Sequence, residues 1–189
     1  MQKKRIAVFA SGSGTNAERI IRYFSQSDIA EVAVLVCNRP GAGAIDRARS
    51  LGVPVELLDR TQINTPQVMN PVFDRYGIDL VVLAGFLLMV PGFILSRFDG
   101  RVLNIHPSLL PKFGGKGMYG HHVHEAVIAA GETVTGITVH LVSEQCDGGR
   151  ILFQAQVPVD PADSAADIEH KVHQLEYIHY PQQIERMLQ

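Results

Sequence analysis

Two polar side chains, Asn104 and His106, interrupt an otherwise apolar run between Arg101 and Pro107. Because residues i and i+2 of a β-strand point to the same face, a strand here would place the amide and the imidazole side by side. Both groups donate hydrogen bonds, so the pair could stabilise an anion that forms during a reaction. Pro107 and Pro111 cannot continue a β-ladder and would stiffen the chain where it leaves the strand. The spacing therefore predicts a site at the carboxyl end of a strand, where α/β proteins bind ligands.

A carboxylate further along the chain could complete such a site. Asp147 precedes Gly148 and Gly149, whose lack of side chains allows a close backbone approach. On its own, an Asp before Gly is most simply a turn former, and a lone His106 is most simply a hydrogen-bonded core residue. Together they suggest chemistry, because a nearby carboxylate favours the imidazolium and can relay a proton. We expect Asp147 and His106 to act as one unit.

Alternating strand and helix signals place these residues in an α/β fold. Strands are predicted at residues 6–10, 31–37, 53–57, 78–84, 102–106, 134–142 and 151–157. Helices are predicted at residues 17–24, 41–51, 65–76, 125–130 and 165–188, the last with a break near Pro181. This order predicts a Rossmann-like, mostly parallel twisted sheet flanked by helices, with an antiparallel hairpin near the C-terminus. The length of 189 residues fits a single domain over residues 1–189.

A glycine-containing turn at residues 11–16 follows the first predicted strand and precedes a helix. Backbone N–H groups at such a helix start can bind phosphate, and Thr15 or Asn16 could cap the helix or donate to the anion. The segment also matches the loose dinucleotide pattern G-x-G-x-x-A. The second predicted strand, however, is followed by Asn38 and Arg39 rather than by an acidic residue. That ending disfavours NAD and leaves NADP as an alternative.

Residues 112–120 form a loop with four glycines, which we expect to be mobile and to act as a lid. His121, His122 and His124 follow it, and clustered histidines invite a zinc interpretation. No cysteine or carboxylate at ligand spacing supports that interpretation. We expect these histidines to lie at a helix start, with one or more facing the substrate, and we expect no metal.

Composition narrows the classes of partner. The 17 Lys and Arg against 19 Asp and Glu give a net charge of -2, which offers no electrostatic case for nucleic acid. No run approaches the roughly 18 apolar residues that a membrane helix needs. Cys37 and Cys146 are predicted to be free thiols in a reducing compartment. We therefore expect a cytoplasmic protein whose partners are small molecules rather than nucleic acid or membrane.

Four motifs together resemble the folate-dependent formyltransferase family, over essentially the whole chain. They are GTN at residues 14–16, VVLAGF at 81–86, NIHPSLLP at 104–111 and DGG at 147–149. The short N-terminal loop is most similar to the branch of the family that acts on glycinamide ribonucleotide in purine synthesis. The resemblance implies transfer of a formyl group from the co-substrate 10-formyltetrahydrofolate to the amine of that ribonucleotide. It also implies a monomer or weak homodimer.

The resemblance implies roles for individual residues. The catalytic residues would be Asn104, His106 and Asp147. The ribonucleotide would contact Gly14, Thr15, Asn16 and Glu176. The folate would contact Leu87, Leu88, Met89, Val90 and Asn104. The N-terminal half would then hold the ribonucleotide phosphate, and the C-terminal half would carry catalysis and folate binding.

Other functions could use the same residues. A formyltetrahydrofolate deformylase, or a formyltransferase for a sugar nucleotide or methionyl-tRNA, shares this catalytic core but usually carries an extra domain. We expect no room for such a domain before the first strand or after the last helix. Outside this class, an NADP-binding reductase or a nucleotide-binding module would use residues 11–16. Either would leave Asn104, His106 and Asp147 unexplained.

Overall fold

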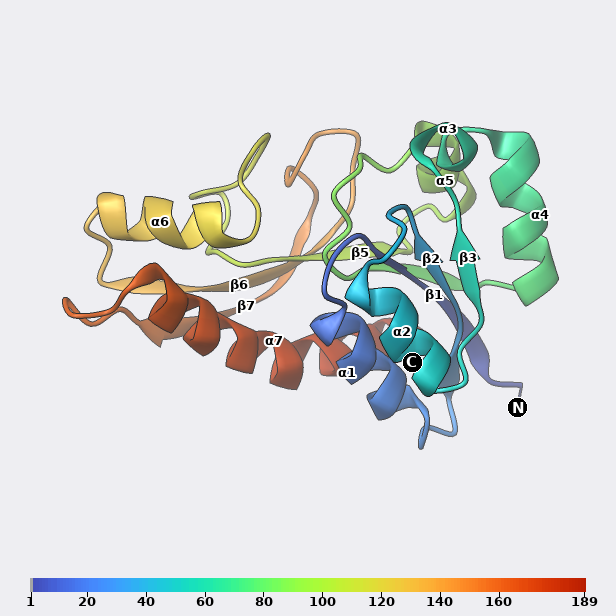
Figure 1. Ribbon diagram of the computed structural model, residues 1–189, viewed down its shortest axis with the longest axis horizontal. Coiled ribbons are helices and arrows are strands. Elements are labelled where there is room, and N and C mark those ends of the chain that lie inside the picture. Colours follow the sequence, from blue (N-terminus) through green and yellow to red (C-terminus); the bar gives the residue numbers. More distant parts are fainter. Residues whose placement is uncertain (1) are drawn as a thin grey trace.

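The computed structural model describes residues 2–189 and contains seven strands and seven helices within them. The strands are β1 (Lys4–Ala10), β2 (Ala30–Cys37), β3 (Val55–Leu57), β4 (Leu80–Leu83), β5 (Val102–His106), β6 (Val134–Leu141) and β7 (Ile151–Pro158). The helices are α1 (Thr15–Phe24), α2 (Gly43–Ser50), α3 (Arg60–Ile63), α4 (Pro66–Tyr76), α5 (Gly92–Arg97), α6 (His121–Ala129) and α7 (Ala165–Leu188). The strands form one sheet in the order β3-β2-β1-β4-β5-β6-β7 (Figure 1).

The sheet is mostly parallel. The strands from β3 to β5 are parallel to their neighbours, whereas β6 is antiparallel to both β5 and β7. The predicted Rossmann-like sheet with a C-terminal antiparallel hairpin is therefore confirmed. From β1 the chain first builds β2 and β3 on one side and then returns to build β4 and β5 on the other. Such a switch point, between β1 and β4, opens a crevice at the carboxyl ends of the strands.

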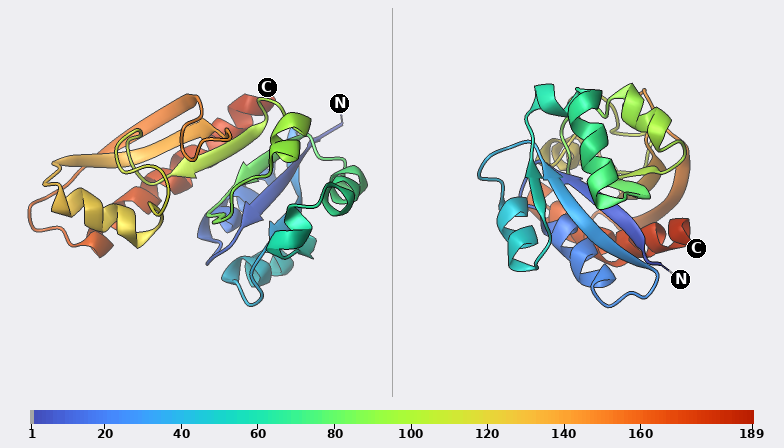
Figure 2. Two further views of the ribbon diagram at one scale, coloured as in Figure 1. Left: turned by 90° about the horizontal axis from the view of Figure 1, so that it is seen from above. Right: turned by 90° about the vertical axis from the view of Figure 1, so that its right-hand side faces the viewer.

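Helices cover both faces of the sheet. Residues on one face, such as Val8 in β1 and Leu103 in β5, pack with α1, α2 and α7. Residues on the other face, such as Phe9 in β1 and Val81 in β4, pack with α3, α4 and α5 (Figures 1 and 2). Because both faces are buried, residues 6–10 of β1 and all of β4 are continuous apolar runs rather than alternating ones. This packing holds the strand ends at the crevice in fixed positions.

The predicted break in α7 near Pro181 is wrong, since α7 runs without interruption for 24 residues. Proline removes one backbone hydrogen bond from a helix. The loss is tolerated here because the neighbouring Tyr180 is fully buried and its hydroxyl donates to the carbonyls of Leu83 (2.8 Å) and Leu103 (3.3 Å). Among the helices of residues 2–189, including this longest one, none combines the length and apolar character needed to cross a membrane.

Candidate active site

Val102, Asn104 and His106 occupy every second position of β5, so their side chains share one face of the sheet. The antiparallel register with β6 places His140 opposite Asn104 and Thr138 opposite His106. Asn104 Nδ2 lies 3.1 Å from His140 Nε2. The polar pair predicted from the sequence is thus assembled at the carboxyl end of β5, but a histidine from β6 joins it.

His106 is buried, with 4% of its surface exposed. Its Nε2 lies 2.7 Å from the carbonyl oxygen of Phe113, which can only accept, so Nε2 carries a hydrogen. Its Nδ1 lies 3.6 Å from Asp147 Oδ2. Nδ1 is consequently the ring nitrogen that remains for a reacting group, and a proton on it would be stabilised by the carboxylate. The two residues expected to act as one unit do lie together.

Asp147 is held in an unusual backbone conformation, with φ of 51° in the left-handed region. Aspartate tolerates this region better than most side chains, which explains how a non-glycine residue occupies the turn. Its Oδ2 accepts a hydrogen bond of 2.8 Å from the backbone N–H of Gly115. The glycine-rich loop at residues 112–120 therefore contacts the carboxylate directly. Its predicted action as a lid stays a prediction.

The turn that presents Asp147 depends on Gly149. A Cβ added there would lie 1.7 Å from the carbonyl oxygen of Leu141 in β6. We therefore expect Gly149→Ala to lower the free energy of unfolding by about 1–3 kcal/mol, as overpacking typically does. Chemical denaturation measures this loss, with Arg150→Ala at the exposed neighbouring position as the control. Equal stability of the two variants would mean that the turn is not closely packed.

The segment that follows β5 contains two prolines and is also held by side chains of the β6–β7 hairpin. Thr138 on β6 donates to the carbonyl of Ser108 (2.7 Å) and accepts from the N–H of Leu110 (3.0 Å). Gln154 on β7 donates to the carbonyl of Leu110 (3.0 Å). These bonds fix the position of the loop that carries the Phe113 carbonyl toward His106.

The loop after β1 leads directly into α1. Gly14 is the N-cap with φ of 78°, and a Cβ there would lie 2.3 Å from Cα of Ala44, so only glycine fits. Thr15 and Asn16 were expected to cap this helix, but no side chain does so. The reason is that the cap position falls on Gly14. The N–H groups of the first turn remain available to an anion.

Asn16 and Glu176 connect this loop with α7. Asn16 Nδ2 donates to Glu176 Oε2 across 2.8 Å, and Glu176 is 5% exposed. Burial raises the pKa of Glu176 to about 7, although the bond from Asn16 acts in the opposite direction. The carboxyl is therefore a buried hydrogen-bonding group that changes charge near neutral pH.

This raised pKa predicts a pH dependence of stability. Between the ordinary value of 4.5 and about 7, the folded state holds a proton that the unfolded state has lost, so stability falls as pH rises through this window. Glu176→Gln removes this titration. Relative to that variant, we expect the wild type to lose up to roughly 3 kcal/mol across the window.

Urea denaturation from pH 4.5 to pH 7.5 measures the predicted difference. Asp28→Asn, at an exposed carboxylate between α1 and β2, is the control. Parallel stability profiles for the wild type and Glu176→Gln would show that the buried carboxyl is already charged at acid pH.

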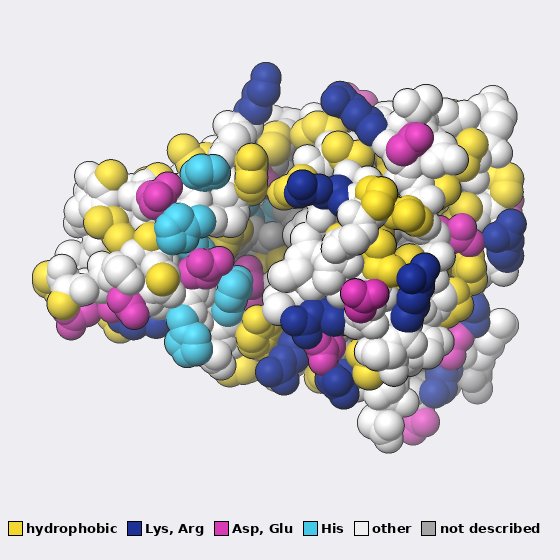
Figure 3. Space-filling model, viewed as in Figure 1, with side chains coloured by type: hydrophobic (Ala, Val, Ile, Leu, Met, Phe, Trp, Pro, Cys, Tyr) yellow, Lys and Arg dark blue, Asp and Glu magenta, His cyan; other side chains and the backbone are white. Residues whose placement is uncertain are grey.

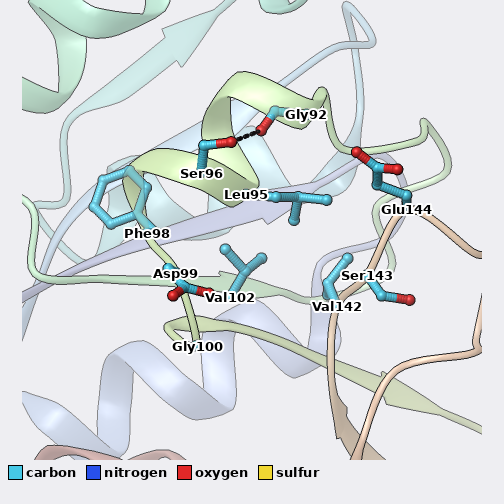
Figure 4. Close-up of a pocket in the computed structure, with 10 residues that line it drawn as sticks. All are labelled: Gly92, Leu95, Ser96, Phe98, Asp99, Gly100, Val102, Val142, Ser143 and Glu144. Carbon is cyan, nitrogen blue, oxygen red and sulfur yellow. Dashed lines mark hydrogen bonds between the residues drawn. The ribbon is translucent and has the colours of Figure 1, made fainter.

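A cavity of about 540 Å³ lies between α5 and the segment that follows β6 (Figure 4). It is lined by Gly92, Leu95, Ser96, Phe98, Asp99, Gly100, Val102, Val142, Ser143 and Glu144. Val102 shares its face of β5 with Asn104, and Glu144 belongs to the loop that carries Asp147. The cavity thus lies along the sheet face that bears the polar cluster.

The sequence predicts folate contacts at residues 87–90 but does not indicate α5, whose residues line the cavity. Leu87 and Met89 are about half exposed, and Val90 is buried in the core beneath α5. None of the four lines the cavity of Figure 4. Pro91 followed by Gly92 could have indicated the start of α5, because proline is common at helix starts. Residues 142–144 offered no signal, since their place depends on the hairpin register.

A second hollow, of about 300 Å³, lies beside the start of α1. It is lined by Thr15, Glu18, Arg19, Arg22, Arg47 and Tyr177. Arg47 donates to the carbonyl of Ser13 across 3.0 Å and pairs with Glu18. Figure 3 shows basic side chains gathered over this part of the molecule. Their positive charge adds to the attraction of α1 for anions.

The clustered histidines lie at the start of α6, as expected, although the helix begins at His121 rather than at residue 125. His121 Nδ1 is 3.5 Å from Glu169, and His122 Nδ1 is 3.4 Å from Glu125. Burial lowers the pKa of His124 to about 4, so this ring is neutral. Figure 3 shows histidines gathered over α6 and α7. Within residues 2–189 no cluster of three or more His, Cys, Asp or Glu side chains could hold a metal ion.

Known proteins that resemble this chain in sequence and structure indicate its family. Residues 4–184 match the family model described as formyl transferase. A phosphoribosylglycinamide formyltransferase from Haemophilus influenzae is 38% identical over 94% of this chain and 84% of its own length. A chloroplastic phosphoribosylglycinamide formyltransferase from Arabidopsis thaliana is 39% identical over 92% of this chain.

The lengths of the relatives differ from that of this chain. The chain spans 63% of the Arabidopsis relative and 18% of a trifunctional purine biosynthetic protein adenosine-3 from Gallus gallus. Among solved structures, glycinamide ribonucleotide transformylase 1 from Geobacillus kaustophilus has a TM-score of 0.90 and 36% identity, with complete coverage of both chains. A phosphoribosylglycinamide formyltransferase from Bacillus halodurans has a TM-score of 0.86 and 37% identity over 98% of this chain and 95% of its own. On the match over residues 4–184, the chain belongs to the formyl transferase family.

Proposed function

We propose that the protein transfers the formyl group of 10-formyltetrahydrofolate to the amine of phosphoribosylglycinamide, in purine biosynthesis. The products are formylglycinamide ribonucleotide and tetrahydrofolate. The observation that carries the proposal is the cluster of Asn104, His106 and Asp147 at the carboxyl end of β5. It lies beside a crevice with an anion-attracting helix start on one side and a cavity on the other. The names of the similar proteins support the same reaction.

The start of α1 is the proposed site for the ribonucleotide phosphate. Gly14, Thr15 and Asn16 would supply backbone N–H groups that no side chain caps. Glu176, joined to Asn16, would accept hydrogen bonds from the rest of the ribonucleotide. The N-terminal half of the chain would in this way hold the phosphate, while residues after β4 carry catalysis and folate binding.

The cavity beside α5 is the proposed site for the ring system of the folate. Its volume of about 540 Å³ is within the usual range for sites that bind small molecules. Leu87, Leu88, Met89 and Val90 would cover the bound folate from the crevice side. Leu87 and Met89 are about half exposed, which suits a contact made on binding.

The proposed reaction needs stabilisation of one anion and movement of one proton. The amine nitrogen attacks the formyl carbon, and the carbonyl oxygen becomes a tetrahedral oxyanion. Asn104 Nδ2 and a protonated His106 Nδ1 would donate to that oxygen, which is usually the largest catalytic contribution in acyl transfer. Breaking of the bond from the formyl carbon to N10 then releases tetrahydrofolate. Asp147, directly or through water, would pass the proton from the attacking amine to N10.

The proposal is tested by measuring tetrahydrofolate release with and without phosphoribosylglycinamide. We expect release to require the ribonucleotide and to match formylated ribonucleotide mole for mole. Release of formate without the ribonucleotide would instead indicate a deformylase. Binding of NADP with no binding of folate would indicate the alternative reductase.

A further inference from the structure

His140 is a buried residue of the cluster to which the proposed reaction assigns no task. It lies directly opposite Asn104 in the β5–β6 register, and 1% of its surface is exposed. Its Nε2 contacts the Asn104 amide at 3.1 Å and lies 3.7 Å from Asp147 Oδ1. A buried histidine that forms a hydrogen bond with a proposed catalytic residue is suited to orienting that residue, here Asn104.

The backbone determines which nitrogen of His140 carries hydrogen. Nδ1 lies 2.9 Å from the carbonyl oxygen of Leu141. A carbonyl oxygen can only accept a hydrogen bond, so Nδ1 must be the protonated nitrogen. Burial lowers the pKa of the ring, and this effect outweighs the opposing effects of the Leu141 carbonyl and Asp147. The neutral ring therefore has a bare Nε2, which can only accept.

An acceptor at Nε2 determines how the Asn104 amide is turned. The side-chain oxygen of Asn104 would meet a lone pair there, whereas its NH₂ group can donate. One of the two amide hydrogens is then used by His140. The second hydrogen on the same nitrogen remains, and it is the one that could reach a developing oxyanion. Without His140, the amide could rotate by half a turn and present its oxygen instead, which would repel that anion.

We infer that His140 is a positioning residue, held as the Nδ1–H tautomer by the Leu141 carbonyl, that fixes the Asn104 amide with an N–H toward the reacting carbonyl. The inference rests on the proposed function. It differs from a purely structural role because the one hydrogen bond that His140 makes with a proposed catalytic residue is the bond from Asn104, whereas its 3.7 Å separation from Asp147 is too long for a hydrogen bond. Loss of the acceptor should therefore matter only while Asn104 is present.

A double-mutant cycle tests this dependence. We expect His140→Leu, which removes the acceptor, to lower kcat by about 10- to 100-fold, below the usual effect of losing an oxyanion donor outright. The KM of each substrate should stay within about twofold, because the loss is confined to the transition state. In an Asn104→Ala background the same substitution should change kcat by less than about threefold. His140→Gln, which can place an acceptor near the position of Nε2, should recover most of the activity.

Equal losses in both backgrounds would overturn the inference and leave His140 a structural residue. A second measurement does not depend on activity. In ¹⁵N-histidine-labelled wild-type protein at neutral pH, the resonance missing from His140→Gln should show a protonated Nδ1 and a bare Nε2. A protonated Nε2 would overturn the inference. If the protein had no transferase activity but showed the expected tautomer, the proposed function would fail while the orienting contact stood.

Discussion

Asp147→Asn is expected to lower kcat for formyl transfer by roughly 10²- to 10⁴-fold, the range typical of a lost general acid or base. The substituted amide keeps the shape of the side chain and can still accept from the Gly115 N–H. It cannot take up the proton of the attacking amine, nor can it stabilise a proton on His106 Nδ1. Steady-state kinetics with both substrates varied should show the loss in kcat rather than in KM.

Asp28→Asn serves as the control for this variant, since Asp28 is an exposed carboxylate in the turn between α1 and β2. Its kinetics should match those of the wild type. Circular dichroism and thermal unfolding should show that Asp147→Asn remains folded. A folded variant that kept near-normal transfer would refute the role given to Asp147.

His106→Ala is expected to lower kcat by about 10²- to 10³-fold, the usual effect of removing one donor to an oxyanion. The substitution removes Nδ1 from the reacting group, and it also leaves the Phe113 carbonyl without its donor at 2.7 Å. Transfer kinetics should again show a change in kcat. His170→Ala, at an exposed position of α7, is the control, and its kcat should match that of the wild type.

Combining Asp147→Asn with His106→Ala should cost far less than the product of the single losses. Residues that act as one unit are strongly non-additive, because either substitution alone already disables the unit. Fully multiplicative losses would mean that the two side chains act independently, despite the 3.6 Å between Nδ1 and Oδ2.

Much of the fold could be predicted because local patterns agree with it. The apolar runs that became β1, β4 and β5 are buried on both faces, so they carry a strong strand signal. The short helix α5 was missed because its six residues are too few to establish a helical period. The uninterrupted course of α7 through Pro181 could not be foreseen, since it depends on Tyr180 reaching carbonyls on β4 and β5.

The site was partly predictable for the same reason. Asn104 and His106 are two residues apart on one strand, so their shared face follows from the β-period alone. The approach of Asp147 to His106 was expected from chemistry and is seen in the structure. The contact of His140 with Asn104 was missed, because cross-strand register is set by pairing and cannot be read from one strand. The cavity beside α5 was missed because it joins segments distant in sequence.

We expect the amide of Asn104, the imidazole of His106 and the carboxylate of Asp147 to meet around one carbonyl when the substrates bind. A crystal structure of the protein with phosphoribosylglycinamide and a non-transferable analogue of formyl folate tests it most directly. We expect the formyl oxygen to lie within about 3.2 Å of both Asn104 Nδ2 and His106 Nδ1, which is hydrogen-bonding distance. The folate ring should occupy the cavity beside α5. A formyl group bound with its oxygen turned away from both nitrogens would contradict the account.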